Sequence, residues 1–155
     1  PEVVLENQAR FLVLLHAAGA IVLVGASTHH FLVSLGYLRG RYKIRLGRIY
    51  ALIVALAYVA TVVLGALAYP TFRYHVRGLF LDRYAVWASN LFEMKENLAA
   101  VGLPLAVAAC LMSRVMNPAE DRHARVRYAA LVFVQTAIVW FNVVSGLLIT
   151  MVRGV

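Results

Sequence analysis

Residues 11–38 read FLVLLHAAGAIVLVGASTHHFLVSLGYL. About 20 apolar residues are enough for a helix to cross the hydrocarbon core of a bilayer, and a longer run spans it with some tilt. This run is also too long for an ordinary core helix of a soluble protein. We therefore expect residues 11–38 to form a transmembrane helix.

Three histidines lie within this run, namely His16, His29 and His30. On a helix at ~100° per residue, His16 and His30 lie within about 40° of each other and roughly 21 Å apart along the axis. His29 points elsewhere. The face with His16 and His30 also carries Ala20, Leu23, Ser27 and Ser34. Because polar groups on membrane helices turn away from lipid, we expect this face to contact protein or a cofactor.

The composition supports several membrane spans. Of the 155 residues, 63% are hydrophobic and only 14% are charged, which leaves too few polar side chains to cover a soluble globule. Further apolar runs at about 49–70, 91–115 and 128–152 predict an all-α integral membrane protein. We expect one domain over residues 1–155, a four-transmembrane-helix bundle with both termini on the same side. Pro70 is expected to end or bend the second helix, and Pro104 to kink the third.

The positive residues sit in short segments beside the apolar runs, so the formal charge of +8 does not indicate a nucleic-acid partner. Residues 39–48 hold five positive residues and no acidic one, and residues 114–127 are also net positive. Positive segments of this kind stay in the cytoplasm and meet anionic lipid. We expect both segments to be cytoplasmic, with the termini outside, in what we take to be a bacterial inner membrane. Arg39–Arg48 is the expected contact for anionic lipid.

The histidines are candidate ligands for b-type haem, since neutral imidazole is a good axial ligand of haem iron. His16 and His30 are the candidate metal ligands, each near one membrane surface. Second ligands have to come from elsewhere, and topology places His75 on the side of His16, and His123 on the side of His30. Met94, Met112 and Met116 are alternative candidates for the second axial ligand of the haem iron. The alternative is that the histidines pack against neighbouring helices or lie in the interface.

A second candidate site is LFEMKENL, residues 91–98, at the mouth of the third run. Glu93, Glu96 and Asn97 fall on one side of a helix, while Lys95 points away. One interpretation is a pocket for quinone or proton exchange, with a glutamate as proton acceptor. The alternative is an interfacial cap paired with an arginine from residues 73–83.

In the fourth run, Gln135 and Asn142 share a face with Ser145, and either bind a quinone or cofactor or hold helices together.

At the level of pattern, the chain resembles the small membrane subunits of respiratory complexes that carry b-type haem or line a quinone site. The residues behind this resemblance are His16 and His30 with Gly19 and Ser27, together with Glu93 and Glu96. It implies an integral-membrane subunit of a multi-subunit electron-transfer complex, with haem b and quinone as cofactors and other membrane subunits as partners. Two alternatives stay open: a cofactor-free accessory subunit, and a component of a proton or ion pathway. The sequence contains no nucleophile–base set and no nucleotide-binding loop, so we do not expect a stand-alone enzyme.

Overall fold

The chain is described by a computed structural model over residue 3 and residues 5–154, and every regular element in this part is a helix. The elements are η1 (Glu6–Gln8), α1 (Ala9–Leu38), α2 (Ile44–Thr71), η2 (Phe72–Leu81), α3 (Asp82–Tyr84), α4 (Val86–Val115) and α5 (Arg122–Val152). Four of them, α1, α2, α4 and α5, are long and apolar enough to cross a membrane. The prediction of an all-helical chain with four helices of spanning length is confirmed.

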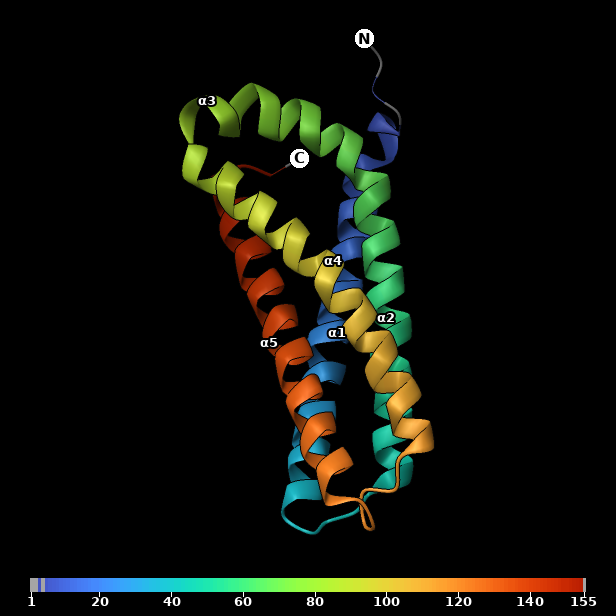
Figure 1. Ribbon diagram of the computed structural model, residues 1–155. Coiled ribbons are helices and arrows are strands. Elements are labelled where there is room, and N and C mark those ends of the chain that lie inside the picture. The colour runs from blue at the N-terminus through green and yellow to red at the C-terminus, as the bar shows by residue number, and fades with distance from the viewer. Residues whose placement is uncertain (1–2, 4, 155) are drawn as a thin grey trace.

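The four long helices form one bundle (Figure 1). Helix α1 packs against α2 and α5, and α4 packs against the same two helices, so the order around the bundle is α1, α2, α4, α5. Helix α1 begins and α5 ends at the same end, which we call the charged end because the ion pairs described below lie there (Figure 1). The connections 39–43 and 116–121 lie at the opposite end, which we call the loop end.

Helix α1 begins at Ala9, close to the predicted 11, whereas the other three long helices begin clearly earlier than the apolar pattern indicates. Helix α2 begins at Ile44 rather than 49, α4 at Val86 rather than 91, and α5 at Arg122 rather than 128. Hydropathy marks only the apolar part of a helix. At the starts of α2 and α5 the backbone extends beyond it through arginine-bearing turns, since arginine is a good helix former. The predicted loop 39–48 is accordingly much shorter in the structure.

The segment after Pro70 differs most from the prediction. Pro70 lies inside α2, and the helical backbone continues through Thr71 into η2, a π-helix of ten residues. A proline removes one backbone donor but does not forbid a helix on its C-terminal side. The segment 71–87, predicted as an irregular connection, is therefore mostly helical and lies across the charged end (Figure 1). Helix α4 likewise continues through Pro104.

Two local motifs fix the helix ends at the loop end. Helix α1 ends at Leu38. Two residues later comes Gly40, whose φ of 77° is left-handed and suits glycine. The Arg41 N–H donates to the Gly36 carbonyl and the Gly40 N–H to the Tyr37 carbonyl, the bonds of a Schellman motif. At the start of α5 the Asp121 carboxylate accepts from the Ala124 N–H over 2.9 Å.

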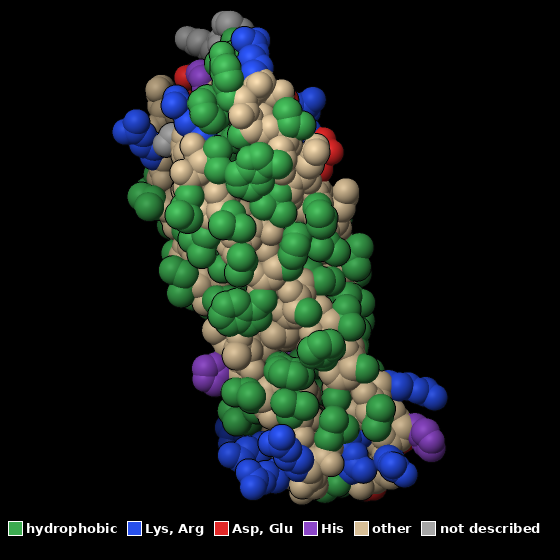
Figure 2. All heavy atoms as spheres, turned by 90° about the vertical axis from the view of Figure 1, so that its left-hand side faces the viewer, with side chains coloured by type: hydrophobic (Ala, Val, Ile, Leu, Met, Phe, Trp, Pro, Cys, Tyr) green, Lys and Arg blue, Asp and Glu red, His purple; other side chains and the backbone are tan. Residues whose placement is uncertain are grey.

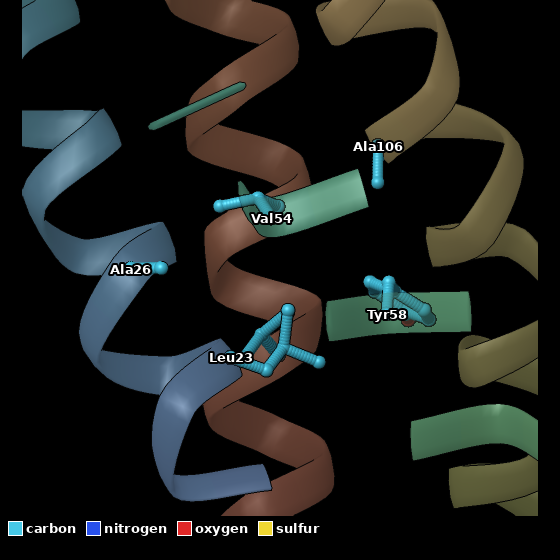
Figure 3. Close-up of a cluster of buried hydrophobic side chains, with 6 residues drawn as sticks. Leu23, Ala26, Val54, Tyr58 and Ala106 are labelled. Atoms are coloured by element: carbon cyan, nitrogen blue, oxygen red, sulfur yellow. The ribbon is translucent and has the colours of Figure 1, made fainter. Parts of the chain in front are cut away.

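The interior of the bundle is closely packed and built largely from small side chains. One buried cluster joins all four long helices through Leu23, Ala26, Val54, Tyr58, Ala106 and Val139 (Figure 3). Ala51, Ala55 and Cys110 form a second contact between α2 and α4, where the small side chains allow the two helices to approach closely. The face shown in Figure 2 is a belt of hydrophobic side chains with basic groups at both ends, as expected for a protein surrounded by lipid.

Candidate functional site

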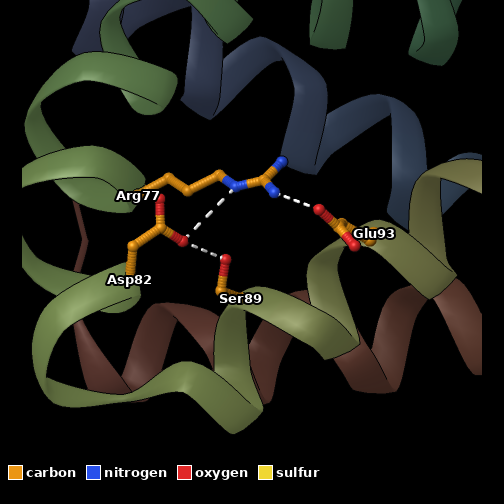
Figure 4. Close-up of polar contacts among 4 residues, drawn as sticks. All are labelled: Arg77, Asp82, Ser89 and Glu93. Carbon is orange, nitrogen blue, oxygen red and sulfur yellow. Dashed lines mark hydrogen bonds and ion pairs between the residues drawn. The ribbon is translucent and has the colours of Figure 1, made fainter.

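Charged side chains from η2, α3 and α4 meet at the charged end of the bundle (Figure 4). The Arg77 guanidinium donates to the Glu93 carboxylate, and its Nε lies 3.7 Å from Asp82 Oδ1. Ser89 Oγ donates to the same oxygen of Asp82. Only 19% of the Arg77 side chain is exposed, so this guanidinium joins three helical segments from a sheltered position.

Aromatic rings lie beside this ion-pair network. The ring of Phe92 stacks on Phe72, with centroids 4.5 Å apart, and on Tyr69 at 6.1 Å. Lys95 Nζ lies 5.6 Å from the centre of the Phe92 ring, and the Arg73 guanidinium lies 6.0 Å from the centre of the Tyr69 ring. Cations over aromatic faces are stabilised by the ring quadrupole. The charged end thus combines flat apolar surfaces with fixed positive groups.

The network borders an open pocket of 380 Å³ lined by Tyr69, Arg73, Arg77, Gly78, Asp82 and Glu93. Its wall is largely the end of α2 together with η2. π-Helical turns are rare and are found frequently at functional sites, where the wider backbone re-aims side chains. In this pocket, the π-helical backbone brings Arg73 and Arg77 to one opening. The pocket therefore offers cationic donors, two carboxylates and the aromatic ring of Tyr69 to a ligand that enters at this end.

The predicted acidic mouth is only partly assembled into this site. Glu93 pairs with Arg77, one of the arginines expected in the capping interpretation. Glu96 and Asn97 are exposed on α4 and do not line the pocket. Lys95 turns into the bundle, where its Cε lies 3.5 Å from the position that a Cβ on Gly146 would take.

His16 is half-buried and hydrogen-bonded within the bundle. Its Nδ1 donates to the Thr61 carbonyl over 2.8 Å, and Nε2 carries no hydrogen in that tautomer. The ring packs tightly on α2, since a Cβ on Gly65 would lie 3.1 Å from its Cε1. Gly65 is therefore the residue of α2 against which this histidine packs.

His30 is completely buried between α1 and α5. Its Nε2 lies 2.6 Å from the Tyr128 hydroxyl, and the two rings meet edge to face. Leu23, Ser27 and Ser34 on the same helix face are buried as well, whereas His29 is exposed. The predicted inward orientation of the His30 face is confirmed. The interior group that His30 contacts is a tyrosine of the same chain.

The proposed second ligands lie in other surroundings. His75 Nε2 lies 2.9 Å from Glu6 Oε1, and His123 is exposed in the first turn of α5. Met94 is exposed, Met112 is half-buried and Met116 packs into the interior near Tyr128. In the described part of the chain, no hydrogen bond joins His16 to His75 or His30 to His123, and no group of three His, Cys, Asp or Glu side chains has metal-binding geometry.

The polar stripe of α5 faces the interior. Gln135 and Ser145 are buried and Asn142 is half-buried. Asn142 lies beside the Tyr58 hydroxyl, which donates to the Ala99 carbonyl of α4. Neither amide atom of Gln135 has a hydrogen-bond partner within the described residues. Gln135 and Asn142 lie in the bundle interior, away from the pocket at the charged end.

Several important residues were not singled out from the sequence. Asp82 and Ser89 lie in or next to a segment whose composition is typical of a loop, and Tyr128 marks the edge of an apolar run, where tyrosine is common. One signal was available for Tyr128: it precedes Gln135 by seven residues, so Tyr128, Gln135 and Asn142 share one helix face. Arg77 was expected as one of several possible arginine partners of the acidic mouth, and no signal in the sequence selected it from the others.

Comparisons with known protein families, with curated proteins and with solved structures find no significant match to this chain.

Proposed function

We propose that the protein is an integral-membrane subunit of a multi-subunit electron-transfer complex and that it lines a quinone site at the charged end. The observation that carries this proposal is the pocket bordered by Tyr69, Arg73, Arg77 and Glu93. A quinone headgroup is flat and apolar with two carbonyl acceptors. The ring of Tyr69 offers one aromatic contact to the headgroup, and the arginines fit its oxygens.

The chemistry of quinone reduction fits the charges of this end. Reduction of a quinone to a quinol takes up two electrons and two protons, and each proton binds a carbonyl oxygen. The electrons come from a redox centre of a partner subunit, and the protons come from water through exposed carboxylates such as Glu93 and Glu96. Arg77 stabilises negative charge that develops on the oxygen before protonation. The chain's own part is to bind, orient and protonate the headgroup.

A binding experiment with a short-chain ubiquinone tests the quinone site. The purified protein in nanodiscs of neutral lipid is titrated with this probe. Arg77→Gln is expected to weaken binding about ten- to hundredfold, since a charge-assisted hydrogen bond contributes about 1.5–3 kcal/mol. Arg83→Gln serves as the matched control, because Arg83 is exposed and does not line the pocket. Absence of quinone binding, or equal loss in both variants, contradicts the proposal.

Haem ligation by His16 or His30 remains a prediction. For His30, the nitrogen without a partner is Nδ1, and ligation through Nε2 requires the Tyr128 hydroxyl to leave. Tyr128 packs against Tyr37, Ala109 and Val132, which opposes its displacement, so we assign no step to haem. The absorption spectrum of the gently extracted native assembly tests the prediction. A Soret band that disappears in His16→Ala or His30→Ala supports haem, and a colourless complete assembly contradicts it.

A cofactor-free accessory subunit is the second candidate, and the exposed His29 favours it. The ring stacks on Tyr50, and its Nδ1 donates to the Gly25 carbonyl, which leaves Nε2 available on the outer surface of the bundle. An exposed polar group on a spanning helix is more stable against protein than against lipid. A photo-crosslinking residue at position 29 is expected to yield a protein adduct, while the same residue at the exposed, apolar Val22 yields lipid adducts.

We infer that the loop end is cytoplasmic. Arg39, Arg41, Lys43 and Arg45 are exposed there and available to anionic lipid, while Arg48 donates to the carbonyls of Ser113 and Arg114 and caps α4. Single cysteines at positions 41 and 119, introduced after Cys110→Ala, test this orientation. In intact cells a membrane-impermeant maleimide is expected to leave both unlabelled. Labelling of either position in intact cells contradicts the inference.

A further inference from the structure

Gln135 stands out within the bundle as a buried amide without hydrogen bonds. Its side chain is 0% exposed, and neither Nε2 nor Oε1 has a partner within the described residues. It lies on α5 between Val132 and Val139, which belong to two separate apolar clusters. A buried amide that makes no hydrogen bond costs roughly 1–3 kcal/mol, and no bulk water is present in a membrane to relieve this cost.

The burial of Gln135 limits what its partner can be. Neither a lipid nor a neighbouring subunit reaches a side chain that is 0% exposed inside its own bundle. The partner must therefore be small enough to reside between the four helices. Water is the ordinary solution in protein interiors, where a buried water bridges polar groups that lack other partners.

His30 has a free atom at nearly the same depth. The Thr136 hydroxyl donates to the Ser27 carbonyl over 3.2 Å, which aligns this part of α5 with α1. Gln135 immediately precedes Thr136, and His30 lies about one turn, roughly 4.5 Å of rise, beyond Ser27. The His30 ring is also 0% exposed, and its Nδ1 has no partner. Gln135 and His30 thus lie at depths that differ by less than about one helical turn, on two helices that pack together.

The hydrogen-bonding needs of the two side chains are complementary in either tautomer of His30. If Tyr128 donates to Nε2, then Nδ1 carries the proton and requires an acceptor. If Nε2 donates to Tyr128, then Nδ1 requires a donor. Gln135 supplies one unpartnered acceptor and one unpartnered donor group, and water can bridge either combination.

We propose that ordered water bridges the Gln135 amide to Nδ1 of His30, so that the centre of the bundle contains a hydrated proton-binding site. The water gives the His30 ring a hydrogen-bonded neighbour on each nitrogen. A ring connected in this way takes up a proton on one nitrogen and releases one from the other, which a ring with one free nitrogen does not do. This site is independent of the quinone pocket.

Proton-detected solid-state NMR of the ¹⁵N-labelled full chain in lipid bilayers tests the proposal directly. Magnetisation transfer from water is expected at Nδ1 of His30 and at the side-chain amide of Gln135. The Nδ1 signal distinguishes water from the phenol, because Tyr128 contacts Nε2. The absence of a water signal at both groups in the unmodified protein overturns the proposal. A direct Gln135–His30 correlation without water overturns it as well.

A matched pair of variants locates the water. Gln135→Met keeps the size of the side chain and removes the amide, so the water signal at Nδ1 of His30 is expected to disappear. Thr136→Val is the control, because the Thr136 hydroxyl is already bonded to the Ser27 carbonyl and does not need the water. The signal is expected to persist in this variant. A His30 water signal that is unchanged in Gln135→Met contradicts the role of Gln135. If a variant does not fold, the water signals of the unmodified protein alone test the proposal.

Discussion

The hydroxyl of Tyr128 lies 2.6 Å from Nε2 of His30, and this bond joins α5 to α1 inside a completely buried part of the bundle. Apolar packing gives little driving force for helix association in lipid, because lipid tails are as apolar as the side chains. Buried hydrogen bonds between helices contribute specificity that apolar contacts lack. The His30–Tyr128 bond therefore helps to define how α1 and α5 pair.

Tyr128→Phe tests the strength of this bond. The substitution keeps the ring but leaves a buried imidazole nitrogen without a partner, so the free energy of unfolding is expected to fall by about 1–3 kcal/mol. Tyr84→Phe is the control, since the Tyr84 side chain is 75% exposed. The measurement is unfolding of the protein in mixed micelles by titration with denaturing detergent. Equal free energies of unfolding for the two variants mean that the His30–Tyr128 bond contributes nothing to stability.

Gly102→Ala is expected to destabilise the bundle because it adds a methyl group to a filled space. A Cβ at this position would overlap the Tyr58 hydroxyl and lie 2.9 Å from Ile138 Cγ2, so α4 has to move away from α2 and α5. Overpacking of this kind costs about 1–3 kcal/mol. Gly25→Ala is the matched control, because nothing lies within 4 Å of the added atom. Thermal unfolding of both variants checks this difference, and a stable Gly102→Ala protein would show that the interface adapts.

Removal of Arg77 is expected to affect stability more than removal of its partner Glu93. Glu93 is 55% exposed, so Glu93→Gln is expected to cost less than about 1 kcal/mol, an amount that shrinks at high salt. Arg77→Gln leaves the carboxylates of both Glu93 and Asp82 without their cation. Denaturation of both variants at low and high salt measures the difference. An equal cost for the two substitutions indicates that Asp82 does not depend on Arg77.

The helix faces were largely predictable from the sequence, because they follow from the helical period. Spacing alone placed His30 and Ser27 on a buried face and His29 on another, and the structure agrees. Apolar run length gave the four long helices in the same way. Both signals are local, since each compares residues within a few helical turns.

The residues of the candidate site were less predictable. Some of its contacts join residues that are distant in the sequence, and others involve a segment whose composition is typical of a loop although the segment is helical. His30 and Tyr128 are 98 residues apart, and no local pattern connects them. The segment with Arg77 has the polar and aromatic residues of an interfacial loop, but packing of Val76 and Leu81 against α4 and α5 keeps it helical. Tertiary contacts, rather than propensity, determine its conformation.

Acid is expected to loosen the first turn of α5. The Ala124 N–H donates to the Asp121 carboxylate and holds the pKa of this carboxyl below its usual range. A carboxyl whose pKa is lower in the folded state stabilises the fold above its unfolded pKa of about 3.9, and this contribution disappears as the pH falls through the folded value. Hydrogen-exchange protection of the Ala124 amide is therefore expected to decrease between pH 6 and pH 3 in the unmodified protein.

Asp121→Asn and Asp121→Ala separate the charge from the cap. Asparagine caps a helix nearly as well as aspartate but does not titrate, so Asp121→Asn is expected to keep protection at Ala124 that does not change with pH. Alanine has no acceptor, so Asp121→Ala is expected to show weak protection at both pH values. Protection factors, corrected for the intrinsic pH dependence of exchange, make the comparison valid. If the Asn variant loses protection in acid as the unmodified protein does, the loosening originates elsewhere, and Asp121 is a cap whose ionisation has no effect on α5.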